Sequence, residues 1–375
     1  MAIAAKTPLV NVPAQYQAYR DEIDAAVADV VSSGHFILGP VVKSLEEELA
    51  AYVGAKHCVA CSSGSDALLL AMLVLEIGPG DEVVTTPFSF FATAEMVRLL
   101  GATPVFVDIE EDTCNIDAAH IEEVITPQTR AIVPVGLFGQ AADMDEILDV
   151  AARTNLPVIE DAAQSFGADY KDRRSGNLGH ISCTSFFPAK PLGAYGDGGA
   201  VFTDDDTFAE RLRSLANHGQ GERYRHKQIG INGRLDALQA AVLRVKLSHF
   251  DEERERRNEI AARYTNGFSG LPWMTPPTVR PDRSSTWAQY SIQTPERDEF
   301  IQALCEGGIP TAVHYPIPLY RQEALADLQI EPEAFPVTER VCKQIVSLPM
   351  CAFLETANQD VVIASAQRLR GRSRV

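Results

Sequence analysis

Short apolar stretches alternate with helical patterns over the first two thirds of the chain. The stretches are four to six residues long, as is typical of buried strands, and they lie at residues 58–61, 82–85, 104–107, 131–135, 156–159, 182–187 and 200–203. Helical patterns, such as those at residues 66–76 and 91–100, separate several of them. This alternation predicts an α/β architecture with a mostly parallel, seven-stranded sheet that is covered by helices.

Two further helices are predicted from apolar positions that recur every three or four residues. The first spans about 42–53, and Gly54 can end it. The second is long and begins near Arg234. Its charged segment DEERERRNE, residues 251–259, is expected to be a solvated continuation. Its apolar stripe consists of Leu235, Leu238, Val242 and Val245.

A chain of 375 residues is too long for one typical core, so two domains are expected. We predict a large domain at residues 1–250, which includes an N-terminal arm, and a smaller C-terminal α+β domain at residues 251–375. Proline and glycine cluster at 270–281, which indicates a linker or a chain crossing. The basic tail RLRGRSRV, residues 368–375, is expected to fray.

Composition points to a cytoplasmic protein. No apolar run approaches the roughly 20 residues that span a bilayer, and the N-terminal segment lacks the pattern of a signal peptide. The seven scattered cysteines are typical of reduced thiols. Cys58 and Cys61 form a C-x-x-C pair, but no second pair exists and the segment is predicted to be a buried strand, so we predict no metal site.

The formal net charge of −18 argues against nucleic acids and anionic membranes as partners. Residues 221–234 differ from the rest, because this segment carries one acidic residue and several basic ones. A basic loop in an acidic protein is a candidate anion site, and a plain solvated loop is the alternative. Its basic residues are Arg223, Arg225, His226, Lys227 and Arg234.

Candidate chemistry follows the predicted strands, because ligands of open α/β sheets bind beyond the carboxyl ends of the strands. After the first strand, Gly64 permits an unusual turn and Ser65 opens a helix, whose free N–H groups and dipole suit a phosphate. A simple helix cap is the alternative role for Ser65. After the next strand come Phe88, Phe90 and Phe91, and core packing is their default role, although one ring could lie flat on an aromatic ligand.

Two further strand ends carry reactive groups. The apolar run 156–159 ends in Glu160 and Asp161, with Gln164 one helical turn further on. A buried carboxylate needs a cation or hydrogen bonds, and helix capping by Asp161 is the alternative. Ser185 lies at the end of another strand, and Lys190 follows in SFFPAKPLGAYGDGG. A desolvated lysine has a lowered pKa and can attack carbonyl groups.

These parts together match one cofactor. Pyridoxal 5'-phosphate (PLP) has a phosphate, a flat ring, a ring nitrogen that pairs with a carboxylate and an aldehyde that bonds to a lysine. One sheet edge is predicted to offer a partner for each group. The combination is much more specific than any single residue.

The segments EDAAQSFGA, SFFPAKPLGAYGDGGA and GINGRLDALQAA resemble the DegT/DnrJ/StrS family of PLP-dependent sugar aminotransferases, which has the aspartate-aminotransferase fold (PLP fold type I). The resemblance runs from about residue 35 to residue 350. It implies that Lys190 bonds covalently to the cofactor. It also implies cofactor contacts for Gly64, Ser65, Phe90, Asp161, Gln164 and Ser185.

The family further implies a homodimer with shared active sites, because Asn232 matches an asparagine that reaches the phosphate of the other subunit. RHKQIGINGRLDALQAA and TAVHYPIPLYRQ are similar to a branch that aminates UDP-2-acetamido-2-deoxy-3-oxo-glucuronate (UDP-2-acetamido-2-deoxy-ribo-hexuluronate). In that branch, positions matching Arg234, His314 and Tyr315 lie near the sugar acid. A packed strand-end histidine is the alternative role for His314.

The sequence therefore predicts a nucleotide-sugar aminotransferase that moves the amino group of L-glutamate to C3 of this UDP-sugar and releases 2-oxoglutarate, for surface polysaccharide of the O-antigen type. The alternative substrate is a UDP- or dTDP-4-keto-6-deoxy sugar, aminated at C4. A NAD-dependent dehydrogenase is disfavoured, because no G-x-G-x-x-G follows the first strand. A PLP-binding regulator without catalysis is a further alternative.

Overall fold

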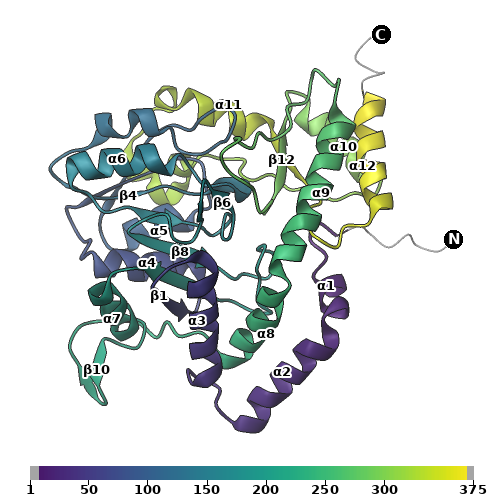
Figure 1. The fold of residues 1–375 in the computed structure, drawn as a ribbon. Coiled ribbons are helices and arrows are strands. Elements are labelled where there is room, and N and C mark those ends of the chain that lie inside the picture. Colours follow the sequence, from purple (N-terminus) through teal and green to yellow (C-terminus); the bar gives the residue numbers. More distant parts are fainter. Residues whose placement is uncertain (1–7, 370–375) are drawn as a thin grey trace.

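The computed structural model describes residues 8–369, so most of the predicted basic tail at residues 368–375 lies outside the described residues (Figure 1). Seven strands form the central sheet, and each matches a predicted apolar stretch to within three residues. The stretch 156–159 is shifted most: β5 starts at Ile159, and Val158 before it makes an isolated bridge to Ile132. The strands are β1 (His57–Cys61), β2 (Glu82–Thr85), β3 (Thr103–Phe106), β4 (Thr129–Val133), β5 (Ile159–Asp161), β8 (Ile181–Ser185) and β9 (Gly199–Thr203).

The sheet consists of two hydrogen-bonded groups, β3-β2-β4 and β5-β8-β9-β1. Parallel bridges from Ile132 to Val158 and from Val135 to Asp161 join β4 to β5. Only β9 runs antiparallel to its neighbours, so the other six strands point the same way. The mostly parallel arrangement is confirmed, and the carboxyl ends of six strands meet at one edge.

Alternate residues of the strands contribute to different cores, which shows that both faces of the sheet are covered. In β1, Val59 and Cys61 belong to the core beneath α4, whereas Cys58 and Ala60 belong to the core beneath α3. The pair Cys58 and Cys61 is thus buried in a strand, as predicted. One face packs against α4 (Gly64–Val74), α5 (Ala92–Leu99) and α7 (Asp206–Leu215), the other against α3 (Pro40–Val53), α6 (Met144–Thr154) and α8 (Ala237–Ser248).

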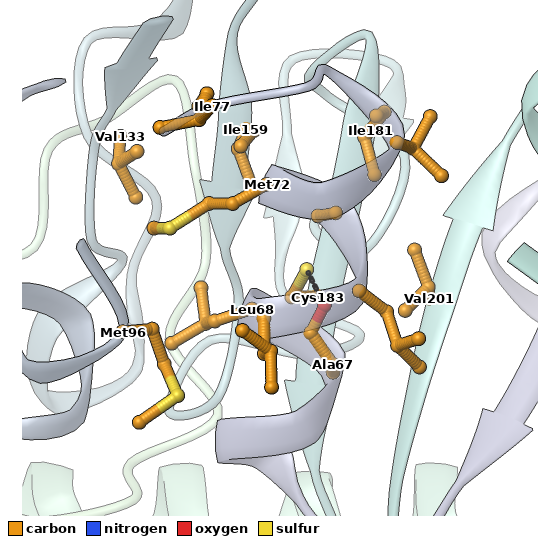
Figure 2. Packing of buried hydrophobic residues seen from close by; sticks show 14 of the residues in the cluster. Ala67, Leu68, Met72, Ile77, Met96, Val133, Ile159, Ile181, Cys183 and Val201 are labelled. Carbon is orange, nitrogen blue, oxygen red and sulfur yellow. Dashed lines mark hydrogen bonds between the residues drawn. The ribbon is translucent and has the colours of Figure 1, made fainter. Parts of the chain in front are cut away.

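Helix α4 is buried along most of its length and is fixed directly on the sheet. Figure 2 shows Leu68 and Met72 among apolar side chains of β4, β5, β8 and β9. The thiol of Cys183 in β8 also donates to the carbonyl oxygen of Ala67 at 3.3 Å. This packing places the first turn of α4 at the end of β8.

The predicted long helix from Arg234 is wrong in two respects. It is divided into α8 and α9 (Phe250–Phe268) at His249, whose backbone is not helical. In addition, the charged segment is not fully solvated, because Glu253, Arg254 and Arg257 are buried. Their partners lie elsewhere in the chain: Gln15 donates to Glu253 at 2.7 Å, Arg254 pairs with Asp169 at 2.8 Å, and Arg257 donates to the carbonyl of Trp287 at 3.1 Å.

The C-terminal part is built around the antiparallel strands β12 (Tyr290–Gln293) and β13 (Ile345–Leu348). Their apolar residues share one core with α9, α10 (Arg297–Glu306) and α12 (Thr356–Leu369), which lie beside one another in Figure 1. The predicted boundary between residues 250 and 251 falls at the start of α9 and stays a prediction.

The remaining elements are short or peripheral. Among residues 8–369 no helix has both the length and the apolar character needed to cross a bilayer. These elements are α1 (Val12–Ala18), α2 (Arg20–Ser33), α11 (Pro336–Gln344), β6 (Asp169–Tyr170), β7 (Arg173–Arg174), β10 (Gln220–Glu222), β11 (Arg225–His226) and six 3₁₀ turns, namely Ala118–His120, Glu122–Val124, Leu137–Gly139, Leu319–Arg321, Glu323–Leu328 and Pro332–Ala334.

Candidate active site

A cavity of about 480 Å³ lies at the carboxyl edge of the sheet, where the sequence places the candidate chemistry. Residues from the sheet, from α4 and from the C-terminal part line it. Nine of the eleven predicted site residues are among them, which are Gly64, Ser65, Phe90, Asp161, Gln164, Ser185, Lys190, His314 and Tyr315.

The first turn of α4 forms one end of the cavity. Ser63 caps the helix, because its hydroxyl accepts a hydrogen bond from the backbone N–H of Asp66 at 3.0 Å. Ser65 is therefore not the cap, and it lines the cavity instead. A Cβ at Gly64 would lie 2.5 Å from the Cβ of Ser185, so only glycine allows α4 to approach the end of β8 this closely. The positive end of the α4 dipole and two serines thus meet in a cradle that suits a phosphate.

Asp161 lies at the end of β5 with 5% of its surface exposed. Its carboxylate accepts hydrogen bonds from Ala163 N–H at 3.1 Å and from the Thr93 hydroxyl at 2.9 Å. Burial raises the pKa of Asp161, and these hydrogen bonds and the charge of Lys190 oppose that shift. No helix follows, since residues 163–167 form turns, so the alternative of a helix cap does not apply.

Lys190 follows β8 and its side chain lines the same cavity. Burial lowers the pKa of the Lys190 amine, and the nearby charge of Asp161 partly opposes this shift. A lowered pKa increases the fraction of neutral amine, which is the nucleophilic form. The structure thus brings a reactive lysine and a buried carboxylate to one cavity.

Gln164 and two aromatic rings form the next part of the wall. The side-chain oxygen of Gln164 accepts from Phe138 N–H at 3.0 Å, and its side-chain N–H donates to the Tyr315 hydroxyl at 3.3 Å. Phe88 is buried in the core, as the default role predicts, whereas Phe90 is 57% exposed and lines the cavity. The ring of Phe90 is therefore free to contact a flat ligand.

His314 is not simply packed at a strand end, because it lines the cavity. Its Nδ1 atom lies 2.8 Å from the hydroxyl of Ser347, which in turn lies 2.7 Å from the hydroxyl of Ser291. Burial and, secondarily, the charge of Lys190 lower the pKa of His314, which favours the neutral imidazole. The ring is held in place by the serines behind it.

Asn232 and Arg234 do not line this cavity. Asn232 is exposed, and Arg234 donates to the side-chain oxygen of Asn217 at 2.8 Å. The basic segment before them forms the β10–β11 hairpin, which projects from the body of the chain in Figure 1. Tyr224 and Ile229 in this segment are 80% and 92% exposed. The segment is thus exposed, and the choice between an anion site and a solvated loop stays open.

Thr93, Asp197 and Gln289 also line the cavity, and sequence reasoning missed all three. Thr93 follows the aromatic run in PFSFFATAE, and its helix also carries Glu95 and Arg98, so nothing in the sequence distinguishes it as a site residue. Asp197 lies in the glycine run after Lys190. Gln289 precedes β12 in the C-terminal part, where no predicted strand end marked it.

The residues present fit PLP on structural grounds. The first turn of α4, where Gly64 meets Ser185, offers the positive end of the helix dipole to a phosphate, and the buried carboxylate of Asp161 suits a protonated ring nitrogen. Lys190 offers an amine, and Phe90 offers an exposed ring face in the same cavity.

Residues 17–367 match the family described as DegT/DnrJ/EryC1/StrS aminotransferases. A UDP-2-acetamido-2-deoxy-3-oxo-D-glucuronate aminotransferase of Pseudomonas aeruginosa is 48% identical over 95% of this chain and 98% of its own. A UDP-N-acetyl-3-dehydro-alpha-D-glucosamine 3-aminotransferase of Acidithiobacillus ferrooxidans is 42% identical over 92% of each chain. The crystal structure of DesV from S. venezuelae with a ketimine intermediate superposes with a TM-score of 0.95 at 42% identity, covering 97% of this chain and 98% of that one.

Proposed function

Since this chain belongs to the DegT/DnrJ/EryC1/StrS aminotransferase family, whose cofactor is PLP, we propose that it transfers the amino group of L-glutamate to C3 of UDP-2-acetamido-2-deoxy-3-oxo-glucuronate. The main support for this substrate is the 48% identity, over 95% of the chain, to an aminotransferase named for this sugar. A second relative named for a 3-aminotransferase reaction on a UDP-sugar supports the C3 position. The product would be a UDP-2-acetamido-3-amino uronic acid for surface polysaccharide.

The cofactor, when bound, supplies a ring that withdraws electrons from the carbon that loses or gains a proton. Asp161 would keep the ring nitrogen protonated, because a buried carboxylate favours a positive partner. Ser65, Ser185 and the backbone at Gly64 would hold the phosphate, and Phe90 would contact the ring face. Gln164 would pair with the ring hydroxyl.

Lys190 has two tasks in this proposal. It holds the cofactor between reactions, and its neutral amine takes the proton from the α-carbon of glutamate in the first half-reaction. In the second half-reaction the Lys190 ammonium would deliver a proton to C3 of the sugar, the carbon that gains the nitrogen. Burial lowers the pKa of the Lys190 amine and so favours its neutral form, and the charge of Asp161 partly opposes this shift.

The proposal includes a homodimer and a cytoplasmic location. Asn232 would reach the phosphate of the partner subunit, and Arg234 together with His314 and Tyr315 would bind the sugar carboxylate. The exposed position of Asn232 supports a role outside its own cavity. The seven cysteines are all free thiols, which agrees with a reducing compartment.

A half-reaction measured by visible absorbance tests the function. The enzyme is converted to its amino form with glutamate, excess glutamate is removed, and either the 3-oxo uronate or a UDP-4-keto-6-deoxy sugar is added. We expect the yellow band of the Lys190-bound cofactor to return only with the 3-oxo uronate. Return only with the 4-keto sugar would support C4 amination, and no reaction with any ketosugar would favour a regulatory role.

A further inference from the structure

The first turn of α5 brings a further helix N-terminus to the cavity, besides that of α4. Its first two residues, Ala92 and Thr93, line the cavity. Phe91 at the N-cap position provides no side-chain hydrogen bond, and the N–H groups of Ala92 and Thr93 have no acceptor among residues 8–369. The positive end of the α5 dipole and two backbone donors are therefore left for a bound group.

Ser89 lies just before this turn, and its side chain has no partner in the described part of the chain. Only 3% of its surface is exposed, and it lines the same cavity. Its hydroxyl forms no hydrogen bond with any residue in the range 8–369, and it is not sealed from solvent. A buried hydroxyl is rarely left unpaired, so a ligand that fills the cavity must pair with it.

The hydroxyls of the two nearest threonines in the chain do have protein partners. The Thr86 hydroxyl accepts from the N–H of Phe88 at 3.2 Å, and the Thr93 hydroxyl donates to Asp161 at 2.9 Å. Beside the start of α5, the free hydroxyl of Ser89 completes a set of donors around the positive end of a helix dipole. Such a set attracts an anion, and toward an anion a hydroxyl acts as the donor.

The charges on the wall favour a carboxylate that is held by neutral donors. Among residues 8–369, no arginine lines the cavity, and its one lysine, Lys190, bonds to the cofactor in the proposed function. The other charged side chains of this wall, Asp161 and Asp197, are acidic. A substrate carboxylate therefore needs O–H and N–H donors here, which Ser89 and the first turn of α5 offer.

The position of Ser89 agrees with the residues already assigned to the sugar carboxylate. The rings of Phe88 and Phe90, which flank Ser89 in the chain, have their centroids 6.0 and 6.4 Å from that of Tyr315. The segment 88–90 thus packs against Tyr315, which the proposed function places at this carboxylate.

Both substrates carry a carboxylate at the same number of bonds from the reacting carbon. In glutamate, the side-chain carboxylate carbon is the third carbon after the α-carbon, reached through Cβ and Cγ. In the 3-oxo uronate, C6 is the third carbon after C3, reached through C4 and C5. One subsite can therefore hold the carboxylate of either substrate while the reacting carbon takes the same place at Lys190.

We propose that the Ser89 hydroxyl and the first N–H groups of α5 form a carboxylate subsite, which the side-chain carboxylate of glutamate and the C6 carboxylate of the 3-oxo uronate occupy in turn. This inference rests on the proposed function and deepens it, because it explains how one cavity accepts an amino acid and a nucleotide sugar. A 6-deoxy sugar has no group for this subsite.

The variant Ser89→Ala keeps the shape of the wall and removes the O–H donor. In the holoenzyme, kcat/KM of the half-reactions with glutamate and with the 3-oxo uronate should each fall about tenfold to a hundredfold. L-Glutamine and UDP-2-acetamido-2-deoxy-3-oxo-glucose are the neutral counterparts, because they lack this carboxylate. Their rates should differ less than about twofold between variant and wild type, since no charge-assisted hydrogen bond is lost.

Ser284→Ala is the matched control, because the Ser284 hydroxyl donates to Asp169 at 2.9 Å outside the cavity. It should lower Tm and leave both half-reactions unchanged. Ser89→Ala should leave the Tm of the holoenzyme unchanged, because no protein partner loses a hydrogen bond.

Three results would each overturn the proposal. They are an unchanged rate with glutamate or with the 3-oxo uronate, an equal loss with the neutral counterparts, and a loss with both sugars but not with glutamate. The last result would assign the subsite to the diphosphate of the nucleotide. Failure of wild type on the 3-oxo uronate would instead refute the proposed substrate, and the comparison of glutamate with glutamine would still test the subsite.

Discussion

The hydroxyl of Thr93 donates to the buried carboxylate of Asp161, and this single contact allows a test of the electrostatics of the site. Thr93→Val keeps the shape and removes the donor, so the pKa of Asp161 should rise further. Because a hydrogen bond to a charged group contributes about 1.5–3 kcal/mol, we expect both half-reactions to slow about tenfold to a hundredfold. Single-turnover absorbance measures both rates. Thr93→Ser retains the hydroxyl and should restore most of the rate. Rates of Thr93→Val equal to those of wild type would show that the hydrogen bond from Thr93 does not stabilise the charge of Asp161.

Lys246 is a buried lysine behind the loop that carries Lys190, and its amine donates to the carbonyl of Gly193. Burial lowers its pKa from 10.5 to about 8. The folded state thus binds fewer protons than the unfolded state between pH 8 and 10.5, so the free energy of unfolding should rise with pH in this window.

The variant Lys246→Met removes this titration. The stability of wild type relative to Lys246→Met should increase between pH 8 and 10.5, by up to about 3 kcal/mol. Urea unfolding at several pH values provides the measurement. A pH-independent difference between the two proteins would show that the amine titrates normally in the folded state.

Among the elements, the segment 270–287 is fixed by Arg283 to residues 141–143, which precede α6, and the Arg283 side chain is only 3% exposed. Its guanidinium pairs with Asp143 at 2.7 Å and donates to the carbonyls of Ala141 and Ala142 at 2.9 and 3.1 Å. Arg283→Met should therefore destabilise the protein by about 3 kcal/mol in urea unfolding, because buried partners lose their donor. Arg130, whose side chain is 58% exposed where it pairs with Asp81, is the control, and Arg130→Met should lower the free energy of unfolding by less than about 1 kcal/mol. Equal effects would mean that the segment is not held by Arg283.

Elements with a clear local pattern could be predicted from the sequence, and those that depend on distant partners could not. The seven strands follow from their apolar runs, and the site residues that directly follow strands could be located because parallel strands end at one edge. The break at His249 and the burial of Glu253 could not be predicted, since the partner of Glu253 is Gln15, more than 200 residues earlier. Gln289 was missed for the same reason, because the packing of the C-terminal part on the sheet places it.

At the scale of the whole molecule, the proposed homodimer predicts that two defective chains can complement each other. Lys190→Ala removes the amine from one cavity, and Asn232→Asp would place a carboxylate beside the phosphate in the partner's cavity. When the two variants are co-expressed, half of the cavities in mixed dimers carry neither change, so activity should return to up to about a quarter of wild type. Each variant expressed alone serves as the control. No recovery in a sample that sedimentation shows to contain mixed dimers would refute the shared site.

The position of β9 in the sheet also affects how the chain folds while it is being translated. Within the sheet of the described residues, β1 is hydrogen-bonded to one strand, β9, and residues 62–198 separate the two; Cys61 also makes an isolated bridge to Arg234. During translation at about 5–20 residues per second, the apolar segment HCVAC therefore waits roughly 7–27 s with an open edge before its partner leaves the ribosome. Open apolar edges are prone to aggregation, so nascent chains that stop before residue 199 should depend on chaperones far more than the complete chain does.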